Sequence, residues 1–417
     1  MKSLSKSNIN LINITVFLLI IQLQLHPLLP DFLRLTLSTT LSLILLILAV
    51  HRNNYKIINL KFFIWWIGFL FIALVSVFFT VSADESIGRI LSLILSLIFL
   101  GAISQYTRTK KDIYRILNYF IFGGTLFISL VFINNLNKIM TGSFSSLSFG
   151  MEYTYVSLQT LCIVIWKLVY QKGNIFLYYT LSIFILFMNF ISGNKKVMII
   201  PIVFIIVLLT LKNRNRVFKN LLYLILIMII LLVGYQIIME NTFFYNVIGY
   251  RVEGLLNYFT GEGRIDGSTR TRFGLLNEAF SVVKEHPIIG VGLGAFRTIN
   301  TYQTYAHNNY LELLSGTGIL GLIAFYWIFL YLLIYLMLKM KTIKDPLIPL
   351  LIALIVSLLV HDLGTVSYYR TILTLFVCIS ICYMNILQKD LKDNYLSKPI
   401  TKKTNEIYFS KTYMNKN

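Results

Sequence analysis

Charged residues are scarce in this sequence, and their scarcity limits the class of protein. Only 13% of the 417 residues are Asp, Glu, Lys or Arg, whereas 57% are hydrophobic and the mean hydropathy is +0.75. Soluble domains carry about 25% charged residues, so a soluble globular protein is excluded. Apolar runs of roughly 17 to 25 residues, long enough to cross a hydrocarbon core as helices, recur along the chain. The sequence therefore predicts a polytopic membrane protein.

Cysteines are also few, and none of them lies in the long loop. Cys162, Cys378 and Cys382 all fall inside apolar runs, which argues against a disulfide framework. The sequence shows no metal-ligand spacing, no P-loop, no paired carboxylates in its long loop and no internal repeat. These absences favour an activity without metal, nucleotide or other cofactor, and they count against a transporter built from two similar halves.

Basic residues outnumber acidic ones by 37 to 17, and their placement predicts the orientation. Most lie in short loops on one side of the membrane, which is typical of cytoplasmic loops and does not indicate nucleic-acid binding. Both termini are expected in the cytoplasm and the long loop outside it. The first span resembles a signal peptide that is retained as an anchor. Twelve spans are expected, at 9–25, 33–50, 60–82, 86–104, 115–136, 150–170, 174–192, 196–212, 219–239, 309–338, 346–361 and 369–387.

The expected fold is all-α and polytopic, with about twelve transmembrane helices and one large, partly helical extracytoplasmic loop. Four parts follow: nine spans in 1–239, the loop in 240–308, three spans in 309–388 and a basic cytoplasmic tail in 389–417. The lysine-rich tail is expected to contact anionic lipid.

The long loop contains one clear amphipathic helix. Ser268 or Thr269 is a suitable N-cap, and Pro287 ends the helix. Arg270 and Arg272 fall in its first turn, where backbone N–H groups and guanidinium groups can face one anion; binding of lipid phosphates is the alternative. The apolar face, expected on the membrane or the bundle, carries Phe273, Leu276, Phe280 and Val283.

Other ionisable residues stand out by position. His307, at the mouth of the tenth span, is a candidate base or a structural interfacial histidine. Lys195 and Lys196 lie in a short outer turn, where positive charge opposes the topology; snorkelling to headgroups is the alternative. Arg89 lies one turn inside the fourth span and either pairs with Glu85 or belongs to a site.

Glycines punctuate the region around these residues. The segment 290–296 predicts a compact turn. The segment 316–321 matches a dinucleotide-binding fingerprint literally, but it lies in a span with no preceding strand. We interpret those glycines as helix-packing residues.

Together these features resemble the O-antigen ligase and polysaccharide polymerase superfamily of bacterial envelopes, whose fold is GT-C-like. The shared pattern runs from a loop arginine through Glu285-His286-Pro287 and a glycine-rich turn to Ala306-His307-Asn308-Asn309-Tyr310-Leu311 and Gly316-Thr317-Gly318-Ile319-Leu320-Gly321, over about 55 residues. Arg272 stands at the family's loop arginine and His307 at its histidine. Lys195 replaces an arginine, and Leu276 stands where the family often has tryptophan.

The resemblance implies a membrane glycosyltransferase of capsule, exopolysaccharide or O-antigen synthesis in the bacterial plasma membrane. Its donor would be a glycan on undecaprenyl pyrophosphate, and its acceptor the hydroxyl of another glycan. His307 would be the base and Arg272 would act on the pyrophosphate, without metal or cofactor. Residues expected to bind pyrophosphate or glycan are Arg270, Lys195, Lys196, Arg89 and Asn308.

Alternatives remain within and beyond this family. A polymerase is preferred, because the chain is compact and lacks an additional soluble domain, but a ligase has the same pattern. A flippase for the same lipid-linked glycan is the alternative of another class, and a non-catalytic scaffold is a third. Expected partners are membrane lipid, a flippase and a chain-length regulator, and not nucleic acid.

Overall fold

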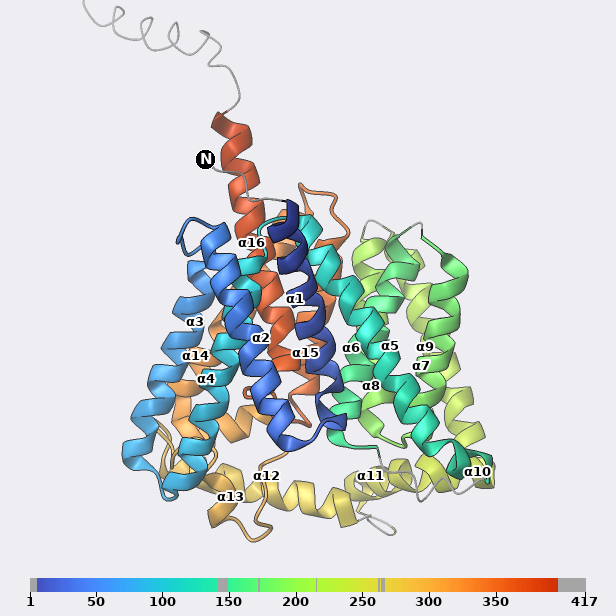
Figure 1. Cartoon of the computed structure of the whole chain (residues 1–417). Helices are drawn as coiled ribbons and strands as arrows, with labels where there is room; N and C mark the ends of the chain where they lie inside the picture. Colours follow the sequence, from blue (N-terminus) through green and yellow to red (C-terminus); the bar gives the residue numbers. More distant parts are fainter. Residues whose placement is uncertain are drawn as a thin grey trace, which may run out of the picture.

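The computed structural model describes residues 6–141, 149–171, 173–214, 216–261, 263 and 267–396. These residues form helices, turns and loops without a strand, so the protein is an all-α polytopic membrane protein (Figure 1). The bundle helices are α1 (Lys6–Leu25), α2 (Asp31–Arg52), α3 (Leu60–Ser76), α4 (Ala83–Tyr106), α5 (Lys110–Met140), α6 (Met151–Tyr170), α7 (Ile175–Ile191), α8 (Lys195–Lys212), α9 (Val217–Glu240), α14 (Asn309–Met340), α15 (Leu347–His361) and α16 (Thr371–Leu396).

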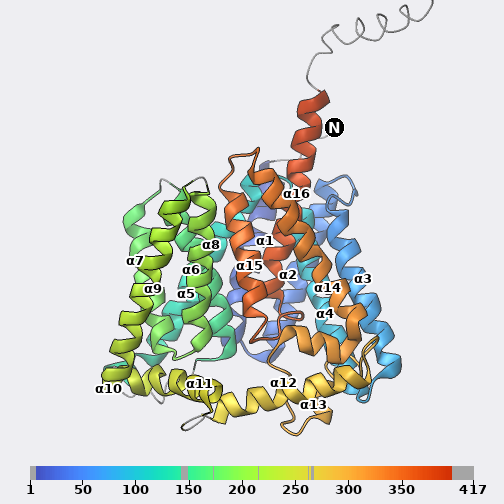
Figure 2. The same ribbon diagram turned by 180° about the vertical axis from the view of Figure 1, so that it is seen from behind.

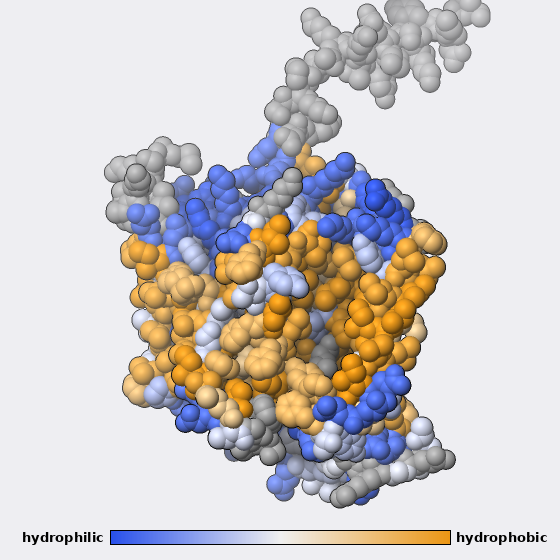
Figure 3. All heavy atoms as spheres, turned by 90° about the vertical axis from the view of Figure 1, so that its right-hand side faces the viewer, coloured by the Kyte–Doolittle hydropathy of each residue, from blue (hydrophilic) through white to orange (hydrophobic). Residues whose placement is uncertain are grey.

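Each of the twelve expected spans has a helix in the structure. Among the described residues, eight helices are long and apolar enough to cross a membrane, and three apolar helices are shorter. The remaining bundle helix, α6, is in neither group; its residues from Tyr153 to Lys167 are all buried, so it forms a centre of the bundle. Figure 3 shows apolar side chains around the middle of the molecule and hydrophilic ones toward both ends.

The described start of α1 and the end of α16 lie at the same end of the bundle (Figure 1). The described residues of 240–308 lie at the opposite end, which we call the loop end. Helix α16 continues to Leu396, beyond the expected boundary at 388. Residues 397–417 of the predicted basic tail lie outside the described residues.

Buried tryptophans connect helices that are distant in sequence. Trp65 of α3 donates its indole N–H to the carbonyl of Phe325 in α14 at 2.9 Å, and Trp166 of α6 donates to Pro346 at 2.8 Å, just before α15. An indole N–H that leaves water needs such an acceptor, and the ring buries a large apolar area. These contacts hold α14 and α15, the two helices beside the candidate site, against the rest of the bundle.

The loop residues cross the loop end as short helices: α10 (Thr242–Phe244), the π-helical η4 (Tyr245–Gly249), α11 (Tyr250–Thr260), α12 (Gly267–Glu285) and α13 (Phe296–Ile299). Figure 2 shows α11, α12 and α13 along this end, below the bundle helices. Helix α12 ends shortly before Pro287, as its sequence predicts.

The face of α12 that packs on the rest of the protein differs from the predicted apolar stripe. The buried face carries Leu275 and Ala279, which pack against Phe296 and Ala306. Phe280, by contrast, is 53% exposed. The reason is close approach: α12 packs on the chain's own segment before α14, and small side chains admit that contact better than a broad aromatic stripe.

The glycines in α14 do more than pack helices, which corrects our interpretation of them. Gly318 has φ 63° and ψ −165°, so the helix is broken there. The carbonyl of Gly316 is free to accept the N–H of Gly292 at 2.9 Å, and Ser315 accepts that of Val291 at 2.8 Å. A Cβ at Gly318 would lie 2.1 Å from the Ile288 carbonyl group. The break thus docks the glycine-rich turn on α14 by backbone hydrogen bonds.

Candidate active site

His307 lies directly before α14, in a strained backbone conformation with φ 54°. Its half-buried ring packs on that of Tyr305, with centroids 4.2 Å apart. Asn308 is the N-cap of α14: its side-chain oxygen accepts the N–H of Leu311 at 3.0 Å, and its amide donates to the Leu363 carbonyl at 3.3 Å. Asn308, predicted to bind substrate, therefore has local partners that hold His307 in place.

A buried polar network holds the backbone after His307. Asn309 is fully buried, and its side-chain oxygen accepts N–H groups of Ser367 at 2.8 Å and Tyr368 at 3.2 Å. Its amide donates to the Tyr326 hydroxyl at 2.7 Å, and that hydroxyl donates to the Asp362 carboxylate at 2.6 Å. Burial raises the pKa of Asp362 to about 7. The network joins the start of α14 to the segment between α15 and α16.

A second buried contact holds the backbone before His307. The carboxylate of Glu312, in the first turn of α14, accepts the N–H of Ala306 at 2.8 Å. Glu312 is 2% exposed, so the hydrogen bond is shielded from competing water. The left-handed conformation of His307 is therefore fixed from both sides.

Two cations lie near enough to His307 to affect its imidazole. Arg272 of α12 and Lys196 of α8 both act on it electrostatically, so the structure brings together three of the residues predicted from sequence. Burial, and then the positive charges of Arg272 and Lys196, lower the pKa of His307 to about 4. At neutral pH the imidazole is therefore uncharged and free to accept a proton.

Lys196 is anchored by the segment after α15. Its ammonium group donates to the hydroxyl of the buried Thr365, and it acts electrostatically on Asp362. The side chain of Lys195, predicted to bind phosphate, lies outside the described residues.

Arg270 does not share this position. Its side chain is exposed, whereas that of Arg272 is half-buried. Residues two apart on a helix point about 200° away from each other, so one turn of α12 cannot direct both guanidinium groups at His307. The expectation that both arginines face one anion at the start of this helix is not met by this geometry.

Arg89 of α4 lies in a separate cluster. Its guanidinium group stacks over Tyr369, 4.2 Å from the ring centroid. Glu85, the partner weighed in the sequence, instead pairs with Arg297 at 3.4 Å. Arg89 therefore contacts the segment between α15 and α16 and is not held by its own helix.

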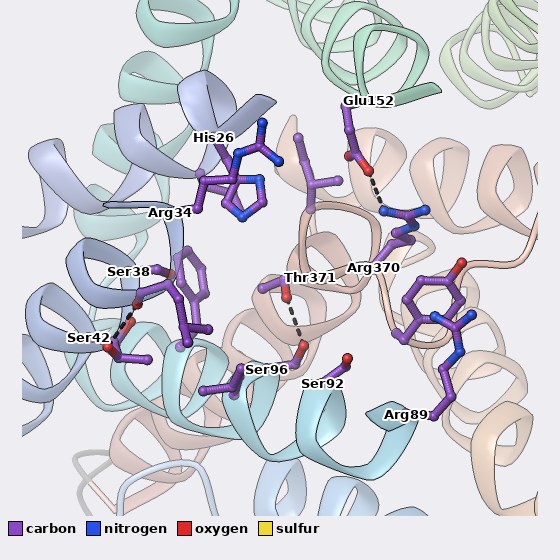
Figure 4. Close-up of a pocket in the computed structure, with 17 residues that line it drawn as sticks. His26, Arg34, Ser38, Ser42, Arg89, Ser92, Ser96, Glu152, Arg370 and Thr371 are labelled. Atoms are coloured by element: carbon purple, nitrogen blue, oxygen red, sulfur yellow. Dashed lines mark hydrogen bonds and ion pairs between the residues drawn. The ribbon is translucent and has the colours of Figure 1, made fainter. Parts of the chain in front are cut away.

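Sequence reasoning did not select Arg370, which lies beside Arg89. Arg370 forms an ion pair with Glu152 and stacks on Tyr369, 4.7 Å from the centroid. Figure 4 shows Arg370, Glu152 and Arg89 around one pocket. The available signal was a cation in a short loop predicted to be extracytoplasmic, where the charge rule disfavours it.

The residues around His307 are suited to proton transfer together with stabilisation of a developing negative charge. An uncharged imidazole accepts a proton, while an adjacent guanidinium and ammonium stabilise negative charge that develops nearby. Within the described residues, no three His, Cys, Asp or Glu side chains are grouped to hold a metal ion.

The fold and this cluster define a polytopic membrane protein with a potential acid–base and anion-stabilising site. Residues 180–326 match the model of the O-antigen ligase family, and this segment contains Lys196, Arg272 and His307. The match confirms the predicted relation to the O-antigen ligase and polymerase superfamily and indicates glycan transfer of that general type. A comparison with curated proteins gave no match.

Proposed function

We propose that this protein transfers a glycan from undecaprenyl pyrophosphate to the hydroxyl of an acceptor glycan on the extracytoplasmic side of the plasma membrane. The observation that carries the proposal is the uncharged imidazole of His307, on which the positive charges of Arg272 and Lys196 both act. The family match over residues 180–326 supports the reaction class.

In the proposed step, the acceptor oxygen attacks the anomeric carbon of the donor. The bond from that carbon to the pyrophosphate oxygen breaks, and the acceptor proton passes to His307. Arg272 and Lys196 stabilise the charge that develops on the departing pyrophosphate. The guanidinium fork of Arg272 suits two phosphate oxygens, whereas Lys196 acts as a point charge.

The donor's own charge makes the base stronger. In the free protein burial, and then the charges of Arg272 and Lys196, lower the pKa of His307. A pyrophosphate beside the two cations offsets their field, so the part of the shift that they cause is reduced and the pKa of His307 rises when donor binds. We therefore expect His307 to be a stronger base in the donor complex than in the free protein.

We place the loop end outside the cytoplasm because of the charge distribution. Most basic residues lie in short loops at the opposite end or follow α16, in agreement with the positive-inside rule. A lipid carrier presented at the outer leaflet would then bring its pyrophosphate to the level of His307 and Arg272.

The acceptor separates a polymerase, our preferred form of the activity, from a ligase. The test is mass spectrometry of the lipid-linked glycan pool, with leaflet accessibility, in cells carrying His307→Gln. Single repeat units at the outer leaflet support a polymerase, and long chains left on the carrier support a ligase. Units trapped on the cytoplasmic side indicate a flippase, and an unchanged pool with normal protein level refutes the proposed role of His307.

A further inference from the structure

A cavity of about 400 Å³ lies among α1, α2, α4, α6 and α16 toward the loop end (Figure 4). This volume is within the range of small-ligand sites, about 300–1,000 Å³. The residues proposed for transfer do not line it, because His307, Arg272 and Lys196 lie outside its wall. It is a second place where a ligand can be held.

The cavity wall holds more positive charge than its own acids neutralise. Arg370 pairs with Glu152, and Arg34 is satisfied by Asp31 at 2.8 Å together with two backbone carbonyls. Arg89 has neither a hydrogen bond nor an ion pair among the described residues. Arg89 therefore supplies the positive charge on this wall that no paired carboxylate neutralises.

Two buried guanidinium N–H groups of the wall residues also have no acceptor. The Nε atoms of Arg89 and Arg370 are buried without a hydrogen-bond partner in the described part of the chain, and both side chains stack on Tyr369. The carboxylates that act on Arg89 are occupied elsewhere: Glu312 accepts the Ala306 N–H, and Glu85 pairs with Arg297. Two cations on one ring, with unused donors, are suited to an anionic ligand.

The rest of the wall combines hydroxyl groups with apolar side chains, among them Leu23, Leu95 and Phe99. Hydroxyl groups of Ser38, Ser42, Ser92, Ser96 and Thr371 line the cavity. Ser96 and Thr371 hydrogen-bond to each other at 2.7 Å across α4 and α16. Hydroxyls both donate and accept, so they can pair with the hydroxyls of a sugar, while the apolar side chains can contact its C–H face.

We propose that this cavity is a second anion subsite that binds an acidic sugar, one carrying a carboxylate or phosphate, in the glycan substrate. Arg89 and Arg370 would take the anionic group, Tyr369 would be the platform and the Ser and Thr hydroxyls would contact the sugar hydroxyls. The assignment rests on the proposed function, because it treats the ligand as part of the transferred or accepting glycan. Tyr305 connects the two sites: its ring packs on His307, and Tyr369 and Arg370 act on it electrostatically.

The test measures occupancy without requiring catalysis. Ser92→Cys places a thiol on the cavity wall, and the native cysteines Cys162, Cys378 and Cys382 are buried. The rate of maleimide labelling is measured on the full-length protein in nanodiscs. Probes are a hexuronic-acid disaccharide, the corresponding neutral hexose disaccharide and inorganic pyrophosphate. Ser281→Cys, on the exposed side of α12, is the control thiol and should react equally with and without probes.

We expect the acidic disaccharide to protect Ser92→Cys at a concentration at least about tenfold lower than the neutral one, the scale of 1.4 kcal/mol. Arg89→Gln in the same background should remove this preference, whereas Lys284→Gln on α12 should retain it. Equal protection by the neutral disaccharide, protection by pyrophosphate alone, or no protection overturns the proposal.

The outcome is separable from the transfer reaction. Repeating the labelling with His307→Gln should leave protection unchanged, because His307 does not line the cavity. Normal transfer by His307→Gln would refute the proposed function while the labelling result stands. Lost transfer with no protection at Ser92→Cys would refute only the acidic-sugar subsite.

Discussion

The two clusters at the loop end contain different kinds of functional group. The first combines an uncharged histidine with Arg272 and Lys196, and lies in the segment that matches the O-antigen ligase family. The second combines Arg89 and Arg370 with hydroxyl groups around a cavity outside that match. A base beside cations suits bond formation, whereas cations and hydroxyls alone suit recognition. The comparison separates residues that we expect to govern the rate from those that we expect to govern substrate affinity.

The largest expected effect is at His307. Replacement by Gln keeps the side chain polar but removes the proton acceptor, so transfer should fall by about 10²–10⁴-fold. Quantification of lipid-linked and transferred glycan, with protein level measured in parallel, tests this. His51→Gln, an exposed histidine at the end of α2, should behave as wild type. Comparable losses in both variants would contradict a special role for His307.

The second-largest expected loss of transfer is at Arg272. Arg272→Gln removes a cation that stabilises the departing pyrophosphate and should lower transfer by about 10²–10³-fold. Arg272→Lys should recover only part of this, since an ammonium cannot make the planar two-point contact. The exposed Arg270 should matter less than Arg272, and initial rates with Arg270→Gln measure that difference. Equal sensitivity at both positions would disprove the separation of the two arginines by α12.

The break at Gly318 docks the glycine-rich turn on α14, and Gly294 of that turn lies against Arg89, so replacement of Gly318 should disturb both clusters. An added Cβ would overlap the Ile288 backbone at 2.1 Å, and φ 63° disfavours any side chain by about 1–2 kcal/mol. We expect Gly318→Ala to lower the thermal stability of the purified protein and to reduce both transfer and labelling protection. Gly234→Ala in α9, where a Cβ meets nothing within 4 Å, should leave stability equal or slightly higher. A Gly318→Ala protein as stable as wild type would argue against the docked turn.

Arg89 should have a smaller effect of a different kind. If the cavity recognises substrate, Arg89→Gln should raise KM by about tenfold with little change in kcat. Initial rates over a range of donor and acceptor concentrations give this split. A fall in kcat comparable with that of Arg272→Gln would place Arg89 in the transfer step and erase the distinction between the clusters.

The smallest effect is a shift in the pH profile. Because the base must be unprotonated, activity is lost as pH falls through the pKa of His307, about 4 in the free protein. The acid limb of kcat/KM should therefore lie near pH 4, and that of kcat at higher pH, since bound pyrophosphate raises the pKa. Arg272→Gln should move the kcat/KM limb upward. An acid limb of kcat/KM near pH 6.5 in wild type would contradict the cationic surroundings of His307.

Much of the fold was predictable because long apolar runs carry a strong helix signal. The twelve predicted spans each coincide with a helix, and Pro287 correctly marked the end of α12. The buried face of α12 was not predictable, since Leu275 and Ala279 pack on a segment twenty to thirty residues further along. The break at Gly318 was also missed, because its docking partner is a loop and not another helix.

The candidate site was predictable where residues share a motif. His307 and Arg272 were selected from their order in the loop, and the structure brings them together with Lys196. Arg370 was not selected, because its partners come from other parts of the chain: Glu152 starts α6, and Arg89 is in α4. The spacing of residues in the sequence does not indicate that Arg89, Glu152 and Arg370 come together near Tyr369.

The sequence alone determined the membrane class, the helices and the choice of His307 and Arg272 as candidates for the transfer step, because hydropathy and motif order are local properties of the chain. Tertiary structure decided which arginine of α12 faces His307, which partner Glu85 takes and where a cavity opens between α4 and α16. The physical reason is that ion pairs, buried hydrogen bonds and close packing depend on distances between segments up to about 300 residues apart, such as Ser96 and Thr371.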